Sequence, residues 1–493
     1  MSLSNAWNVA TSSLATNAGL TSIVSRNISN AQNATGYVSA KVANLVTGSS
    51  GAAVIQSIAD LTNASLFNSM LSSTSANDAA QALSNGVTQL QQTVSDATST
   101  SDSTTAAASP SSLLQTLATA LQTYSSSPGS SSAASAVFSA AQNLGQGLNT
   151  ASATTQNVRE TADQDMVTSV ATVNSLLSQF QQVNTAIVNG TATGADVTDA
   201  QDQRNTILQS LSQQIGVTTS TASNNSMSIY TDSGVTLFDT TPRSVTMAAT
   251  TTYTASTTGA AVYVDGVPVT GANAIMPIQS GALAGLANLR DTVATQYQSQ
   301  LDSIAGGLVN AFAETATASP TLPGLFTYAG ATSVPGSTLF AGLASEITVS
   351  SAVDPAQGGD PTLIRDGGIN GAAYVQNSTG AAGYNTLINS DVTALTATQG
   401  FPAGTGLAIS NSVTGQAAAS ASWLDGQYQS ATNNATYQTT LSSQASQALS
   451  NATGVNIDQQ MSQMLDLENS YQASAKLIST INTMFTSLLQ AVA

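Results

Sequence analysis

Residues 454–493 carry an apolar stripe whose members are separated alternately by four and three residues. This period of 3.5 residues is typical of one helix of a left-handed coiled coil. A helix over this stretch is roughly 55 Å long, and a single apolar stripe needs a partner to be buried. The stripe consists of Ile457, Met461, Met464, Glu468, Tyr471, Ala475, Ile478, Asn482, Phe485, Leu489 and Val492.

The first residues of the chain offer a weaker stripe of the same period. It gives way to a loop composition at residues 30–37. Two such stripes also fit ordinary core helices. Their position at the two ends of the sequence, where most chains fray, favours an assembly module in which the ends pair as a coiled coil. The N-terminal stripe consists of Leu3, Trp7, Ala10, Leu14, Asn17, Thr21, Val24, Ile28 and Ala31.

The composition excludes several classes of function. The 493 residues include 8 basic and 25 acidic ones, which gives a net charge of −17. Such a chain lacks the basic surface that binding to nucleic acid requires. No run of 18 apolar residues predicts a membrane span, and no basic segment followed by an apolar one predicts a cleavable secretory signal. Cysteine and histidine are absent, which removes disulfides, thiolate nucleophiles and imidazole bases or ligands.

The periodicity along the chain predicts a mainly α protein with a β-rich insert. Short helical patterns, such as residues 137–148 and 166–189, alternate with turns in the first half. Short strands are expected at 228–230, 235–238, 244–247 and 262–264, with a hairpin turn at Asp265-Gly266. The predicted organisation is a terminal coiled-coil helix (1–40), a linker (41–60), a helical domain (61–216), a β-rich insert (217–280), a long returning helix (281–314), an irregular or reduced outer domain (315–382), a second helical return (383–453) and the C-terminal coiled-coil helix (454–493).

Candidate chemistry is sparse. Asp196, Asp199 and Asp202 are spaced by three and could ligate a hard cation. Compensation of the helix dipole together with pairing to Arg204 explains the same pattern more simply. No clustered acid pair suggests a glycosidase, and without histidine the many serines cannot form a serine–histidine triad. We therefore expect no catalytic residues, no cofactor and no metal site.

Motifs at both ends resemble the signatures of bacterial flagellar axial proteins. At the N-terminal end these are residues 27–30 (Asn-Ile-Ser-Asn) and 35–37 (Thr-Gly-Tyr). At the C-terminal end they are residues 454–458, 471–476 and 478–480. The interior narrows the resemblance to the first hook-associated protein, the FlgK family of hook–filament junction proteins. The interior segments that carry it are 199–205, 215–217 and 280–286, followed by Arg290.

The resemblance implies a structural protein at the junction of hook and filament, a template on which the filament assembles, with terminal helices that fold as they assemble. Its expected partners are copies of itself in a ring, hook protein, another hook-associated protein on the filament side, an export chaperone and the flagellar type III export apparatus. It implies an extracellular location without a cleaved signal and without membrane insertion. Asn27, Asn30, Gly36 and Tyr37 would shape the turn that leaves the axial helix. The axial assembly seam would consist of Leu3, Trp7, Leu14, Val24, Ile28, Ile457, Met461, Met464, Tyr471, Ala475, Ile478, Phe485, Leu489 and Val492.

Other functions stay open at this stage. The nearest alternative is another axial protein, either hook protein or the third hook-associated protein. A secreted passenger or adhesin is a different class, but the chain shows no internal repeat of 20–50 residues. An enzyme would have to work without histidine, cysteine or an acid pair.

Overall fold

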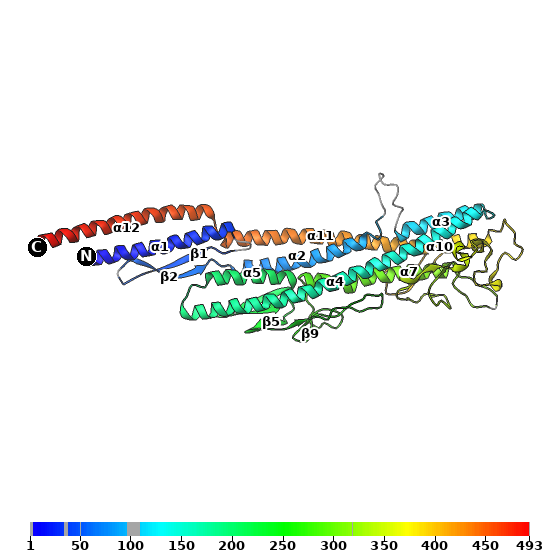
Figure 1. Cartoon of the computed structure of the whole chain (residues 1–493), viewed down its shortest axis with the longest axis horizontal. Coiled ribbons are helices and arrows are strands. Elements are labelled where there is room, and N and C mark those ends of the chain that lie inside the picture. The colour runs from blue at the N-terminus through cyan, green and yellow to red at the C-terminus, as the bar shows by residue number, and fades with distance from the viewer. Residues whose placement is uncertain (1–2, 34–37, 50, 96–108, 318, 493) are drawn as a thin grey trace.

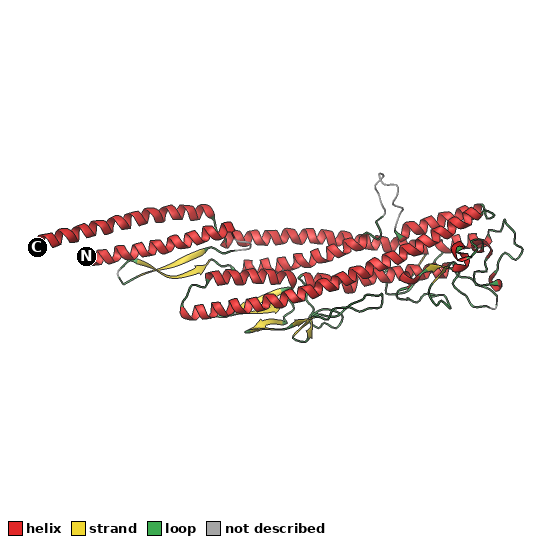
Figure 2. Cartoon of the chain, in the orientation of Figure 1, coloured by secondary structure: helices red, strands yellow, loops and turns green. Residues whose placement is uncertain are grey.

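The computed structural model describes residues 3–33, 38–49, 51–95, 109–317 and 319–492. The chain forms an elongated molecule in which both terminal helices extend together from one end of a long helical body (Figure 1). Loops and short elements gather at the opposite end, and the small sheets lie along one side of the body (Figure 2). The predicted fold class, mainly α with a smaller β-rich region, is confirmed.

The helices account for most of the body. The long ones are α1 (Leu3–Asn33), α2 (Ala64–Gln91), α3 (Pro110–Ser126), α4 (Ser131–Thr193), α5 (Thr198–Gln214), α7 (Ala294–Ala311), α10 (Thr386–Thr396), α11 (Val413–Thr453) and α12 (Ile457–Val492). The short ones are α6 (Ala282–Asn288), the π-helical turn η1 (Leu289–Val293), α8 (Leu343–Glu346), η2 (Ser351–Val353), η3 (Pro355–Gln357), α9 (Leu363–Asp366) and η4 (Ala372–Tyr374).

The strands are short and form small antiparallel sheets. The first two make a hairpin, β1 (Lys41–Thr47) and β2 (Ala53–Asp60). The mid-chain sheets are β3 (Val217–Thr221), β4 (Met227–Thr231), β5 (Thr236–Asp239) and β6 (Thr241–Pro242), and then β7 (Val245–Thr246), β8 (Tyr263–Val264) and β9 (Val267–Pro268). Two further pairs are β10 (Phe326–Thr327) with β11 (Thr348–Val349), and β12 (Gln399–Gly400) with β13 (Ser410–Asn411).

Helix α4 is the axis of the body. It is 63 residues long and packs against α2, α3, α5 and α7. Its buried face is apolar at helical spacing, with Leu144, Val173, Leu177 and Phe180 fully buried. The sequence predicted separate helices at 137–148 and 166–189, but the helix is continuous through the polar stretch between them and ends at Gly194, whose φ of 71° suits glycine.

Short polar side chains set the starts of the body helices. The hydroxyls of Ser109, Ser130 and Ser412 each accept a hydrogen bond from a backbone N–H in the first turn of α3, α4 and α11. Such N-caps satisfy donors that a helix start leaves unpaired. A composition rich in serine and threonine is therefore compatible with long, well-defined helices.

Residues 41–60 differ from the predicted linker, because they form the β1–β2 hairpin. Its register shifts between Asn44 and Leu45. This bulge breaks the alternation of apolar and polar residues that would have marked the strands. The hairpin packs on α1, where the Thr16 hydroxyl donates to the Ala53 carbonyl at 2.7 Å.

Candidate assembly surface

The two terminal helices pair in antiparallel fashion. Asn17 donates to the Ser470 hydroxyl at 2.9 Å, and near the base of the pair Asn27 donates to the Gln460 side chain at 3.0 Å. Higher numbers on one helix meet lower numbers on the other, and both termini lie at the same end of the molecule (Figure 1). The ends of the chain thus form the two-helix module that the sequence suggested.

The α12 residues that face α1 follow the predicted period in a different phase. Gln460, Leu467 and Ile481 are buried, although none belongs to the predicted stripe. The predicted residues that are partly buried are Met464, Ile478 and Phe485. Ile457, Met461, Tyr471, Ala475 and Leu489 are exposed, and the side chain of Val492 lies outside the described residues. The contact face has two heptad positions. One coincides with the predicted stripe, at Met464, Ile478 and Phe485. The other lies one residue before the predicted position, so that Gln460, Leu467 and Ile481 face α1.

On α1 the predicted stripe lies closer to the contact. Val24 is buried, and Leu3, Trp7, Leu14 and Ile28 are partly buried. Ile23, which the stripe did not include, is buried as well. Helix α1 is covered on two sides, by α12 and by the hairpin, which explains why more of its surface is enclosed.

Two of the four residues expected to shape the turn after α1 fall on described positions. Asn27 is buried and bridges elements, because its side chain donates to the Lys41 carbonyl and accepts from the Lys41 N–H, each at 2.9 Å. Asn30 is partly buried in the last turns of α1. Gly36 and Tyr37 lie outside the described residues.

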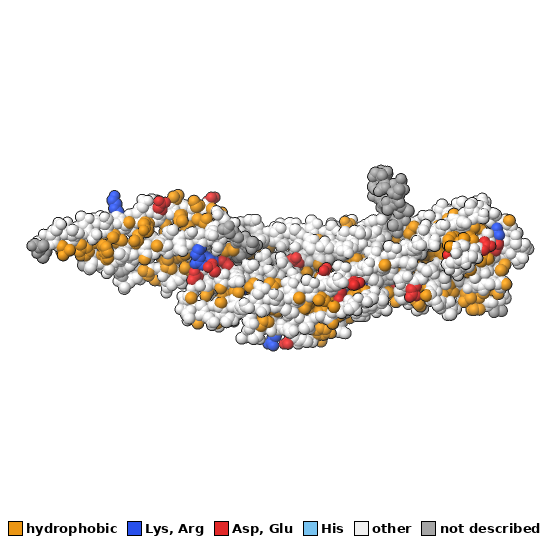
Figure 3. Space-filling view, in the orientation of Figure 1, with side chains coloured by type: hydrophobic (Ala, Val, Ile, Leu, Met, Phe, Trp, Pro, Cys, Tyr) orange, Lys and Arg blue, Asp and Glu red, His pale blue; other side chains and the backbone are white. Residues whose placement is uncertain are grey.

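Helix α12 leaves many large apolar side chains exposed beside its contact with α1. Its exposed large side chains are Ile457, Met461, Leu465, Tyr471, Leu477, Met484, Leu488 and Leu489. Leu465 is 60% exposed and Leu489 is 69% exposed. Apolar side chains gather along this end of the molecule, while much of the body surface is uncharged and polar (Figure 3). Exposed apolar side chains gathered in this way mark an interaction surface.

The hairpin extends the apolar surface. Val42, Leu45 and Val46 of β1 are exposed. The hairpin lies beside α1 at the same end of the molecule as α12 (Figure 1). The terminal module therefore presents apolar side chains from both a helix and a strand.

The three aspartates that could have ligated a cation are paired with basic side chains at the base of this module. Arg26 of α1 contacts Asp196 and Asp199, each at 2.8 Å, and Lys41 contacts Asp202 at 2.5 Å. In the described part of the chain no three acidic side chains gather in an arrangement suited to a metal ion.

The expected pairing of these aspartates with Arg204 is wrong. Arg204 instead donates to the Asn184 side chain at 3.3 Å and to the Asn225 carbonyl at 2.7 Å. Burial lowers its pKa to about 10.

A second charged cluster lies inside the body. Arg290, in the π-helical turn, contacts Asp163 at 2.6 Å, and both side chains are almost fully buried. Arg159 donates to the Arg290 carbonyl and lies 4.7 Å from the ring centre of Tyr253. The π-helical turn shifts the phase of this helix and directs Arg290 inward, which periodicity alone could not predict. The cluster ties the β-rich side of the molecule to α4.

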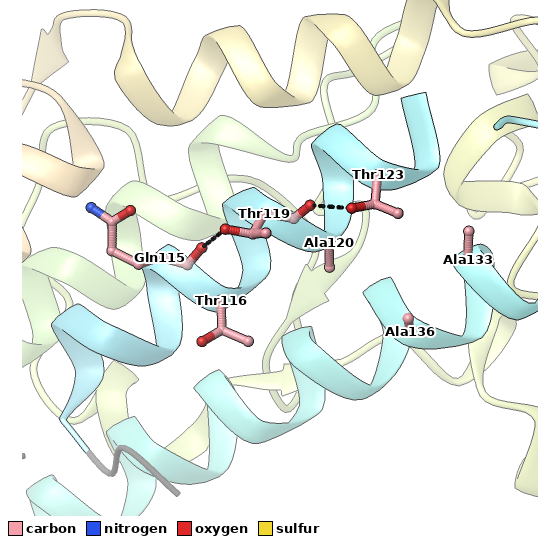
Figure 4. Close-up of a pocket in the computed structure, with 7 residues that line it drawn as sticks. All are labelled: Gln115, Thr116, Thr119, Ala120, Thr123, Ala133 and Ala136. Carbon is pink, nitrogen blue, oxygen red and sulfur yellow. Dashed lines mark hydrogen bonds between the residues drawn. The ribbon is translucent and has the colours of Figure 1, made fainter. Parts of the chain in front are cut away.

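The surface of the body also carries a pocket formed by two neighbouring helices. It lies between α3 and α4, lined by small and polar side chains, and encloses about 420 Å³ (Figure 4). Two of its threonines donate to carbonyls of their own helix, Thr119 to Gln115 and Thr123 to Thr119. The described residues that line it are all uncharged. Among the described helices none has a stretch apolar and long enough to cross a bilayer.

Comparisons with known proteins agree with this arrangement. The sequence model described as the flagellar hook-associated protein FlgK helical domain matches residues 102–326. The model described as the flagellar basal body rod FlgEFG protein C-terminal region matches residues 445–491. No curated protein matches the sequence. The structure of the flagellar hook junction protein FlgK from Burkholderia pseudomallei has a similar fold, with 14% identity, a TM-score of 0.56, and coverage of 77% of this chain and 99% of that chain.

A helical body with paired terminal helices and these two matches defines the chain as a bacterial flagellar axial protein. Within this class, its helical body is similar to the helical domain of the hook-associated protein FlgK.

Proposed function

We propose that this protein is a structural component of the bacterial flagellum that forms the junction between hook and filament and serves as the template on which the filament assembles. The observation that carries the proposal is the imbalance on α12. Among its described side chains, this helix buries three, Gln460, Leu467 and Ile481, and leaves eight large apolar ones exposed. In the assembled axis these exposed side chains pack against neighbouring copies.

The energetics support assembly through this face. Covering a fully exposed Leu or Met side chain stabilises a contact by about 1.5–3 kcal/mol. A long helix with so little buried surface is marginal when isolated, because ordering the backbone costs about 1–2 kcal/mol per residue. The terminal helices therefore gain their full order as copies pack around the axis. The predicted seam residues of the exposed face, Met461, Tyr471 and Leu489 among them, belong to this interface.

The proposed partners follow from the position at the junction. They are copies of this chain in a ring, hook protein on one side and another hook-associated protein on the filament side. The exposed apolar face of α12 requires protection before assembly, which an export chaperone would provide on the way to the flagellar type III apparatus. We propose export without a cleaved signal, and a role that involves no catalysis and no binding of nucleic acid.

A pair of variants on α12 tests the assembly face. Leu465→Asp places a charge among the exposed apolar side chains, and Asn469→Asp adds the same charge at an exposed polar position of the same helix. We expect both proteins to be secreted in equal amounts. Leu465→Asp should leave hooks without filaments, whereas Asn469→Asp should support filaments of normal length in electron micrographs. If the Leu465→Asp protein supports normal filaments, the exposed apolar side chains of α12 are not part of the assembly interface.

A strain lacking the gene tests the position in the flagellum. Bare hooks with flagellin released into the medium are the expected result. Missing hooks would assign the chain to the rod or hook. Normal filaments would refute a role in the axis.

A further inference from the structure

The base of the terminal module holds a compact group of six charged side chains, which we call the root cluster: Arg26, Lys41, Asp60, Asp196, Asp199 and Asp202. It lies where the terminal helices leave the body, and basic and acidic side chains meet at this place on the surface (Figure 3). Its members come from α1, both strands of the hairpin, the loop that precedes α5, and the start of α5. The root cluster thus joins the two parts of the molecule.

Lys41 is the centre of the root cluster. Its side chain is fully buried, and its Nζ lies 2.5 Å from Asp202, 3.4 Å from Asp60 and 3.4 Å from Asp199. The Asp202 carboxylate also accepts from the hydroxyl of Ser39 at 2.8 Å. One ammonium group therefore holds the hairpin against the first turns of α5.

Backbone bonds around Lys41 connect the remaining elements. The Ala40 N–H donates to the Thr453 carbonyl at the end of α11, and the Leu61 N–H donates to the Ala40 carbonyl, each at 2.8 Å. The first bond breaks when the hairpin separates from α11, and the second breaks when the base of the hairpin opens next to Lys41 and Asp60, so the two amides report on opening at the root cluster.

The charges of the root cluster do not balance. Two cations face four carboxyl groups. The Asp60 side chain is 3% exposed, and its Oδ2 is buried without a hydrogen-bond partner in the described structure. Burying a carboxyl oxygen without a hydrogen-bond partner costs much free energy when the group is ionised, and much less when the group carries a proton.

We propose that the root cluster is a proton-sensitive joint, in which protonation of Asp60 holds the terminal coiled coil firmly on the helical body and its ionisation loosens that attachment. The charged groups that face Asp60 are Lys41, Asp202 and Asp196. Around them lie Arg26 of α1 and Asp199. Two further side chains at this place, Asn27 of α1 and Gln460 of α12, are neutral.

The electrostatics agree with this geometry. Burial, and secondarily repulsion by Asp202, raise the pKa of Asp60 to about 7 from its ordinary 3.8, although Lys41 opposes the shift. In the open joint Asp60 meets water and regains its ordinary pKa. The closed joint therefore binds one more proton between these two values. The free energy that favours the closed joint is therefore largest at acidic pH. It falls as the pH rises from 3.8 to about 7, and it is constant above about 7.

Hydrogen exchange on the full chain tests the joint. We expect the opening equilibrium constant reported by the amides of Ala40 and Leu61 to rise about a hundredfold between pH 5 and pH 8, after correction for intrinsic exchange. Amides in α4 provide the internal reference. Asp60→Asn should abolish the rise, and Asp425→Asn, at an exposed position of α11, should leave it unchanged.

Lys41→Met provides an independent check. It removes the central cation but keeps the length of the side chain, so exchange at both amides should be fast at pH 5 and pH 8 alike. Wild-type exchange that changes less than about threefold across this range overturns the proposal. So does an Asp60→Asn protein that keeps the wild-type pH dependence, or a Lys41→Met protein that exchanges as slowly as the wild type.

Discussion

Replacing Asp163 by Asn should destabilise the helical body more than any other single change of a carboxylate to an amide within α4. Asp163 accepts three hydrogen bonds in the interior. They come from Arg290 at 2.6 Å, from the Tyr253 hydroxyl at 2.8 Å and from the Thr250 N–H at 2.8 Å. Asn keeps the shape of the side chain, but it loses the negative charge and turns an acceptor into a donor.

The expected cost is about 3 kcal/mol. A charge-assisted bond such as the one to Arg290 contributes about 1.5–3 kcal/mol, and a donor left without an acceptor costs about 1–3 kcal/mol. The full 3–5 kcal/mol of a broken buried pair is not expected, because Arg290 keeps two bonds to Asp291, each at 2.8 Å.

Chemical denaturation followed by circular dichroism measures this cost. Asp165→Asn is the matched control, because Asp165 lies two residues away on the same helix and is exposed. The control should change the free energy of unfolding by less than about 0.5 kcal/mol. If the two variants differ by less than that amount, the buried cluster does not hold the β-rich side on α4 in the way described.

Further substitutions test other parts of the account. Asn27→Ala leaves the Lys41 N–H without its acceptor, so thermal unfolding should show about 1–3 kcal/mol of lost stability, whereas Asn8→Ala, at an exposed position of α1, should not. Gly285→Ala should lower the melting temperature, because its Cβ would lie 2.2 Å from the Ala79 carbonyl oxygen, while Gly426→Ala, with open space around it, should raise it. Phe485→Asp should be secreted normally but fail to join the hook; full filaments would contradict this.

The terminal stripe shows what hydrophobic periodicity can predict about a helix and what it cannot. A period of 3.5 predicts a two-helix contact but leaves its phase open when apolar residues surround the helix. Met461 and Leu465 face outward, while Leu467 and Ile481 face α1. The sequence stripe therefore combined residues from the contact with residues from the exposed face, which a single sequence cannot separate.

The β1–β2 hairpin was beyond prediction for a local reason. Its bulge between Asn44 and Leu45 interrupts the two-residue period. The mid-chain strands were easier to predict, because Asp265 and Gly266 both adopt positive φ in a tight hairpin turn that their identities favour.

The charged groups show a different limit. The spacing of Asp196, Asp199 and Asp202 correctly placed them at a helix start, but their partners, Arg26 and Lys41, are distant in sequence. Pairing across more than 150 residues leaves no local signal, so only the fold could reveal the root cluster.

Labelling intact flagella tests the central claim most directly. An epitope placed in the loop between η4 and α10, which lies at the end of the body away from the terminal helices, can be decorated with gold-conjugated antibody (Figure 1). The account predicts one thin band of label at the boundary between hook and filament. Label along the whole hook, along the filament, or at the filament tip alone would contradict it.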